Sequence, residues 1–142
     1  MVELLFGTAG IPVSTQPQTT IDGIKRVAEL GLDCMELEFV RGVYLNEKKA
    51  CLIAEAASSA RIKLSVHAPY FMNFNSHDPK KLKASQEILY KTARIASMCD
   101  AESVVFHTGF YLGDPPQKAY NTIKKYLSEV VGRLEKENNR LY

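Results

Sequence analysis

The feature that most constrains how this chain can fold is a strand-like run followed by a helix-like segment, repeated four times along 142 residues. Short apolar runs, some with the two-residue period of a half-buried strand, predict strands. These runs lie at residues 3–7, 34–39, 63–67 and 103–107. Strands at this spacing leave room for a helix after each one, which is the pattern of βα units.

A helix is predicted after each strand, because apolar residues recur there at helical spacing. The helices begin near Thr19, near Asn46, at Asp78 and after Pro115. Thr19 and Asp78 are residue types that cap a helix N-terminus, and a proline after Asp78 suits the first helical position. The fourth helix is predicted to turn one apolar face inward, with Tyr120, Ile123, Leu127, Val130, Val131 and Leu134.

Strands that alternate with helices of this length are joined by right-handed crossovers into a parallel sheet. Four βα units make half of an eight-unit barrel. The expected fold class is therefore α/β: four βα units forming an incomplete, half TIM-type (β/α) barrel with parallel strands, in one domain over residues 1–142. An open four-stranded α/β sheet fits the same order of elements.

Polar side chains on one face of the middle strands favour the half-barrel. Glu36 and Glu38 alternate with apolar residues in the second predicted strand, and Ser65 and His67 do so in the third. A sheet covered by helices on both sides has strands that are apolar on both faces. The interior of a barrel near an active site accommodates such polar groups.

Composition is that of a soluble globular protein, with 46% hydrophobic and 24% charged residues. The net charge of +2 indicates no strong basic field, although a mildly basic chain can still concentrate charge on one face. Three cysteines without a CxxC pair favour a reducing compartment. Neither a signal peptide nor a membrane-length apolar run is present, so a cytoplasmic protein with no membrane partner is expected.

Three residues with ligand or catalytic chemistry lie at the ends of successive predicted strands: Glu38, His67 and His107. In a (β/α) barrel the reacting groups lie at the carboxyl ends of the strands. Neighbouring strands are about 4.8 Å apart, so these side chains can approach one ion. Imidazole with carboxylate suits zinc and also manganese or iron. A lone strand histidine is more often a hydrogen-bonded residue than a ligand, and two histidines leave a metal site incomplete.

The stretches at 65–90 and 103–111 resemble the endonuclease IV family of apurinic/apyrimidinic endonucleases, enzymes of the xylose-isomerase-like barrel superfamily. The specific part is His-x-x-Tyr-x-x-Asn at 67–73 and Phe-His-x-Gly at 106–109. The resemblance implies a zinc-dependent enzyme that hydrolyses DNA at abasic sites, with up to three Zn2+ ions in the complete site. It implies that His67 and His107 are metal ligands and that Tyr70 and Asn73 contact the DNA.

The chain ends about where a fifth strand of such a barrel would begin, so it corresponds to the N-terminal half of these enzymes. Half a barrel by itself is expected to be inactive, and its two edge strands are expected to pair, for example in a homodimer. Two other functions stay open. Glu36 and Glu38 are typical of sugar isomerases or epimerases that use one divalent ion, with Glu38 as the catalytic carboxylate, and a non-catalytic, self-associating half-barrel is the third.

Overall fold

The computed structural model describes residues 4–137 and 139, and it contains four parallel strands and four helices. In chain order these are β1 (Gly7–Ala9), α1 (Thr20–Glu29), β2 (Cys34–Glu38), α2 (Glu47–Ala60), β3 (Lys63–His67), α3 (Pro79–Met98), β4 (Ser103–Val105) and α4 (Pro116–Lys136). The strands lie side by side in the order β1-β2-β3-β4. This order confirms the predicted α/β class of four βα units in a partial TIM barrel.

The helix starts follow from local side-chain chemistry. Thr19 and Asn46 each accept a hydrogen bond from a backbone N–H in the first turn of the following helix, and Asp78 does the same for Lys80. These bonds satisfy donors that a helix N-terminus otherwise leaves unpaired. The predicted caps at Thr19 and Asp78 are confirmed, and α1 ends two residues before Gly31, which has a φ of +69°.

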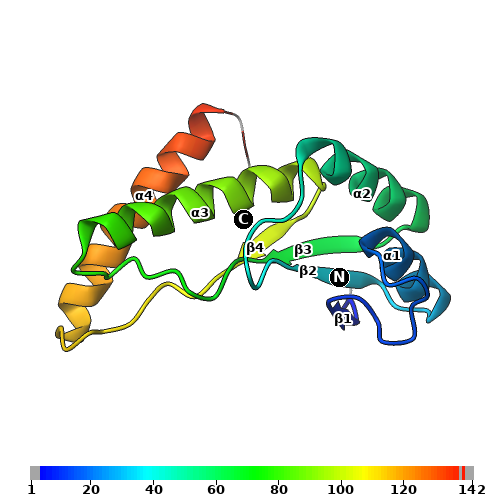
Figure 1. The fold of residues 1–142 in the computed structure, drawn as a ribbon, viewed down its shortest axis with the longest axis horizontal. Coiled ribbons are helices and arrows are strands. Elements are labelled where there is room, and N and C mark those ends of the chain that lie inside the picture. Colours follow the sequence, from blue (N-terminus) through cyan, green and yellow to red (C-terminus); the bar gives the residue numbers. More distant parts are fainter. Residues whose placement is uncertain (1–3, 138, 140–142) are drawn as a thin grey trace.

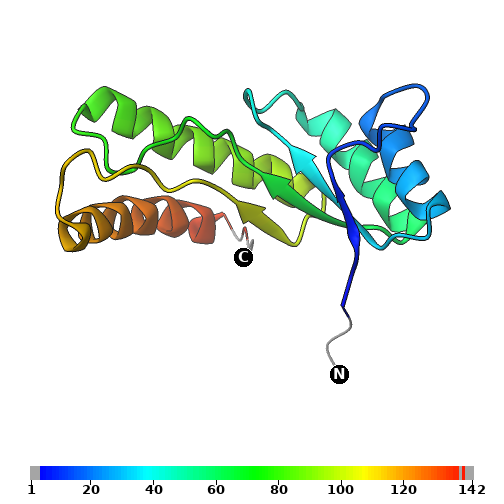
Figure 2. The same ribbon diagram turned by 90° about the horizontal axis from the view of Figure 1, so that it is seen from below.

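The sheet has one apolar face and one polar face. Met35, Leu37, Leu64 and Val66 are buried, in contact with the helices on one side of the sheet. In Figures 1 and 2, α1, α2 and α3 lie on that side, and the opposite face of the sheet is open. The open face corresponds to the interior of a closed barrel, and it carries the polar residues that alternate with the buried ones.

The two edge strands are shorter than their sequence patterns predict. Strand β1 covers Gly7–Ala9 instead of residues 3–7, of which residue 3 lies outside the described residues. Pairing of β1 with β2 begins at Gly7 opposite Cys34, where β2 itself begins, so residues 4–6 have no strand beside them. Strand β4 ends at Val105 instead of His107, because the chain there leaves the sheet for the loop to α4.

Helix α4 packs along α3, and Figure 2 shows the two helices beside each other at one end of the sheet. Val130 of α4 is buried in a cluster with Leu89 of α3. The prediction that Tyr120 and Val131 also point inward is wrong, since 59% of Tyr120 and 44% of Val131 are exposed. The predicted apolar face of α4 is wide enough to contact two helices, but among the described residues α3 is the helix that packs along it.

Candidate functional site

The carboxyl ends of β2 and β3 bring a carboxylate and an imidazole together. Glu38 and His67 are the last residues of their strands and are paired in register, so they are direct neighbours across the sheet. Val105 at the end of β4 pairs in turn with His67, and His107 lies two residues further on. Glu38 and His67 therefore lie side by side at the carboxyl ends of their strands, and His107 lies in the loop after β4.

The two imidazole rings are close to each other, with 5.4 Å between their centroids and planes tilted by 57°. His67 Nδ1 lies 2.8 Å from the carbonyl oxygen of Ala68. A carbonyl oxygen only accepts, so Nδ1 of His67 is the donor in this contact, and Nε2 is the ring nitrogen that the contact leaves for a metal. A backbone carbonyl that holds the second ring nitrogen is the usual arrangement around a metal-binding histidine.

The carboxylates of β2 lie on the same face of the sheet. Burial and the neighbouring Glu38 carboxyl raise the pKa of Glu36, while His67 acts in the opposite direction. Glu36 and Glu38 are two residues apart on β2 and so lie on one face of the sheet, and Glu38 is the register partner of His67. Such a patch of polar residues can exchange protons with a bound substrate.

The residues present meet part of the requirement for a zinc site. Two imidazoles that ligate one tetrahedral Zn2+ at about 2.0–2.1 Å have centroids roughly 5 Å apart, which agrees with the 5.4 Å between His67 and His107. A protein site uses three or four ligands, however. Over residues 4–137 and 139, no group of three or more His, Cys, Asp or Glu side chains is placed to hold a metal ion. The described chain thus offers two ligands of an incomplete set.

The two residues predicted to contact DNA are placed differently. Tyr70 follows β3 by three residues, and 58% of it is exposed. The side-chain oxygen of Asn73 accepts hydrogen bonds from the backbone N–H groups of Asn75 and Phe110. Tyr70 is therefore free to meet a ligand, whereas the Asn73 oxygen already joins two loops. A DNA contact by either residue stays a prediction.

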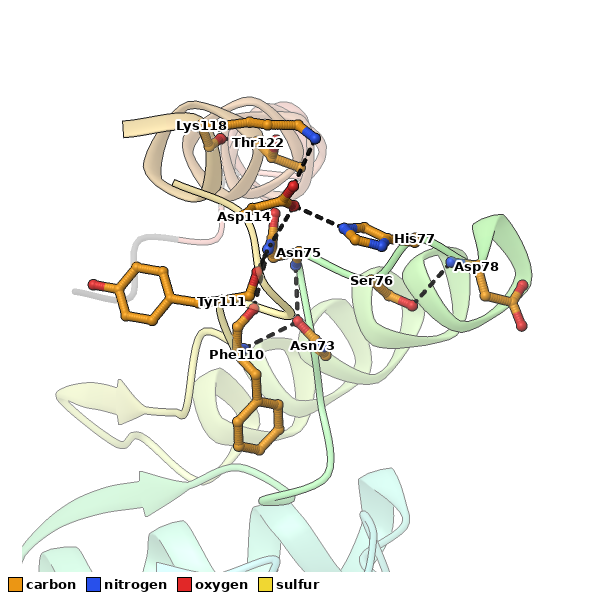
Figure 3. A network of polar contacts seen from close by, with 10 residues as sticks. All are labelled: Asn73, Asn75, Ser76, His77, Asp78, Phe110, Tyr111, Asp114, Lys118 and Thr122. Atoms are coloured by element: carbon orange, nitrogen blue, oxygen red, sulfur yellow. Dashed lines mark hydrogen bonds and ion pairs between the residues drawn. The ribbon is translucent and has the colours of Figure 1, made fainter. Parts of the chain in front are cut away.

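A network that joins the β3–α3 loop to the β4–α4 loop was not predicted from the sequence (Figure 3). The Asn75 amide, which is 1% exposed, donates to the carbonyl oxygens of Phe110 and Tyr111 and to the carboxylate of Asp114. His77 and Lys118 reach the same carboxylate at 2.7 and 2.6 Å. These hydrogen bonds therefore join the two loops that follow β3 and β4.

The charges in this network shift the titration of Asp114. Its hydrogen bonds from Lys118, then from His77 and Asn75, lower the pKa of the carboxyl from its ordinary 3.8 to about 2. Only the cluster of polar residues at 73–78 marks this network in the sequence. Its partners are 35 to 39 residues away, beyond what a local pattern can indicate.

Sequence comparison finds an uncharacterized archaeal relative and relatives named as probable endonucleases. The chain is 36% identical over 137 residues to an uncharacterized protein of Methanocaldococcus jannaschii, an alignment that covers 96% of this chain and 48% of the relative. It is 29% identical over 72 residues to a Mycoplasma genitalium protein named "Probable endonuclease 4", which covers 51% of this chain and 25% of that protein. The chain thus spans about half the length of the archaeal relative and matches a smaller share of the other.

Among solved structures, a D-tagatose 3-epimerase-like protein superposes with a TM-score of 0.74 and 22% identity, over 97% of this chain and 51% of that one. This likeness supports the fold, a partial TIM barrel. Among the described residues, no helix has the length and apolar content needed to cross a membrane. Residues 24–142 match the family model of the xylose isomerase-like TIM barrel. The chain belongs to the xylose isomerase-like TIM barrel family.

Proposed function

We propose that this chain forms half of the active barrel of a zinc-dependent endonuclease that hydrolyses DNA at abasic sites. The observation that carries the proposal is the pair of neighbouring imidazoles, with Nδ1 of His67 held by the carbonyl oxygen of Ala68. The similarity to a protein named as an endonuclease 4 supports it further. Two histidines that meet at neighbouring strand ends suit a hydrolytic metal centre better than a sugar site built from carboxylates alone.

Each residue of the site has a distinct part in this proposal. His67 and His107 hold the metal, and zinc when bound supplies a hydroxide at neutral pH and neutralises charge on the phosphate. Glu38, the register partner of His67, orients the two histidines or accepts a proton. Tyr70, exposed beyond the end of β3, fills the gap that a missing base leaves in the duplex. An abasic nucleotide is easily extruded because it has no base pair to break.

The test combines metal binding and DNA cleavage. The chain is titrated with Co2+ as a spectroscopic substitute for Zn2+ and assayed on a duplex with one abasic site. We expect His67→Ala and His107→Ala each to weaken metal binding about tenfold or more and to abolish nicking. His77→Ala is the matched control, because His77 pairs with Asp114 and lies away from the metal pair. Full nicking by His67→Ala or by His107→Ala would overturn the proposal.

A second function is favoured by one observation, the two carboxylates that share the open face of β2. Glu36 and Glu38 beside His67 make a proton-transfer group that an isomerase or epimerase with one divalent ion would use. The same preparations are incubated with D-tagatose and Mn2+ or Co2+. Epimerisation that requires Glu38, together with absence of nicking, would favour this function over the endonuclease.

A further inference from the structure

Among the exposed large apolar side chains, two groups lie next to the two edge strands of the four-stranded sheet. The first group extends β1 at its amino-terminal end and consists of Leu4, Leu5 and Phe6, which are 74%, 39% and 62% exposed. The second group begins at the last residue of β4 and continues through the β4–α4 loop onto α4. It consists of Val105, Phe110, Tyr111, Leu112, Tyr120 and Val131. Exposed apolar surface gathered in this way marks places where a protein contacts a partner.

The second group borders a groove of about 790 Å³ between the β4–α4 loop and α4. Phe110 and Tyr111 form one wall, and Tyr120, Leu127 and Val131 on α4 form the other. Lys124 and Glu135 also line it. A groove with apolar walls along a helix fits a further helix or strand that presents apolar side chains.

We propose that two copies of this chain associate about a two-fold axis, with β4 of each copy beside β1 of the other, to close an eight-stranded parallel barrel. The two exposed groups lie at the two edges of the sheet, one next to β1 and the other next to β4. In a head-to-tail arrangement the β1 edge of each copy meets the β4 edge of the other copy, which gives two equivalent interfaces. Both edge strands then gain a neighbour, which removes the unpaired backbone groups of an open sheet.

The strand count supports a second copy as the occupant. One copy supplies four strands in the order β1-β2-β3-β4, so two copies supply eight, the number in a closed (β/α) barrel.

Closure also changes the polar face. Glu38, His67 and His107 lie on the open side of the sheet, and the described residues of one copy hold no group of three metal ligands. In the closed barrel the open sides of both copies face one interior, so each copy contributes imidazoles and carboxylates to a shared site. This last step rests on the proposed function, whereas the association itself does not.

Sedimentation of the chain without metal or DNA tests the association. We expect a species of twice the 15.9 kDa chain mass that dissociates on dilution. Val131→Glu places a charge in the groove and is expected to weaken the dimer about tenfold or more. Leu52→Glu is the matched control, since Leu52 is also 44% exposed on a helix but lies on α2, away from both edges of the sheet.

A second variant tests which surfaces meet. Phe6→Glu lies at the opposite edge of the sheet and is expected to weaken the dimer to a similar extent. Far-UV circular dichroism establishes that each variant keeps its helices. A monomer at all concentrations, or a Val131→Glu variant that dimerises like the wild type, would overturn the proposal. Loss of the dimer in Val131→Glu but not in Phe6→Glu would instead indicate pairing of α4 with α4 and would refute the barrel. These outcomes are measured without the nicking assay, so the dimer proposal and the endonuclease proposal can fail independently of each other.

Discussion

Gly109 lies where the β4–α4 loop passes closest to the β3–α3 loop. Its φ is +142°, and a Cβ added there would lie 2.3 Å from Oδ1 of Asn73 and 3.2 Å from the backbone nitrogen of Phe74. The next residue, Phe110, donates its N–H to the same Asn73 oxygen, so the loop cannot move away without losing that bond. We expect Gly109→Ala to lower the free energy of unfolding by about 2–3 kcal/mol, measured by urea titration.

Gly113→Ala is the control for this prediction. Gly113 also has a positive φ, +83°, but nothing lies within 4 Å of its added Cβ. Its substitution therefore costs only the backbone strain of a non-glycine residue, about 1 kcal/mol. Equal losses in the two variants would contradict the idea that the contact with Asn73 dominates.

Single residues of the candidate site were predictable where a short motif carries them. His67 and His107 stand at the ends of recognisable strand patterns, and a local pattern suffices to find them. Asn75 and Asp114 were not predictable, because each is defined by a partner 39 residues away in the chain. The sequence marks Asn75 only as a loop residue, although it is among the most buried polar side chains described.

At the scale of elements, Asp114 fastens the start of α4 to the loop before α3. Hydrogen bonds from Lys118 and His77 lower the pKa of Asp114 to about 2 from an ordinary 3.8. A carboxyl whose pKa is lower in the folded state stabilises the fold above the ordinary pKa, and this contribution is lost as the pH falls from about 4 toward 2. The free-energy difference between the wild type and Asp114→Asn is therefore expected to shrink over this range, measured by urea unfolding at several pH values.

Asp100→Asn provides the comparison, because Asp100 has a positive φ that asparagine tolerates well and lies away from the loop network. Its difference from the wild type is expected to be small and nearly constant over the same range. A difference for Asp114→Asn that grows as the solution is acidified would have the wrong sign and would exclude the proposed loop contact.

Helices were more predictable than strands in this chain for a physical reason. A helix end depends on its own residues, and Thr19 and Asp78 satisfy their helices locally. A strand end depends on its neighbour, so β1 starts where β2 provides a partner and β4 stops where the loop leaves the sheet. The burial of a helix face also depends on its neighbours, so Tyr120 and Val131 of α4 were wrongly predicted to point inward.

At the scale of the whole molecule, the buried apolar residues form two clusters. The larger joins the sheet to α1, α2 and the end of α3, and the smaller joins the β3–α3 loop and α3 to α4. Val104 contacts both clusters, but it is only partly buried. The order of the βα units predicted one continuous half-barrel, whereas the position of α4 beside α3 divides its packing in two. Regions that share few buried contacts unfold as separate units.

Native-state hydrogen exchange distinguishes these units. Val130 on α4 is 1% exposed in the smaller cluster, and Ile53 on α2 is 2% exposed in the larger one. Val130→Ala removes two buried methyl groups, so we expect α4 amides to open about 2 kcal/mol more easily while α2 amides keep their protection. Ile53→Ala is expected to lower the protection of every helix, by about 2–4 kcal/mol, because the larger cluster supports the sheet on which both units rest. Equal losses of protection in α2 and α4 after Val130→Ala would mean that the chain unfolds as one cooperative unit.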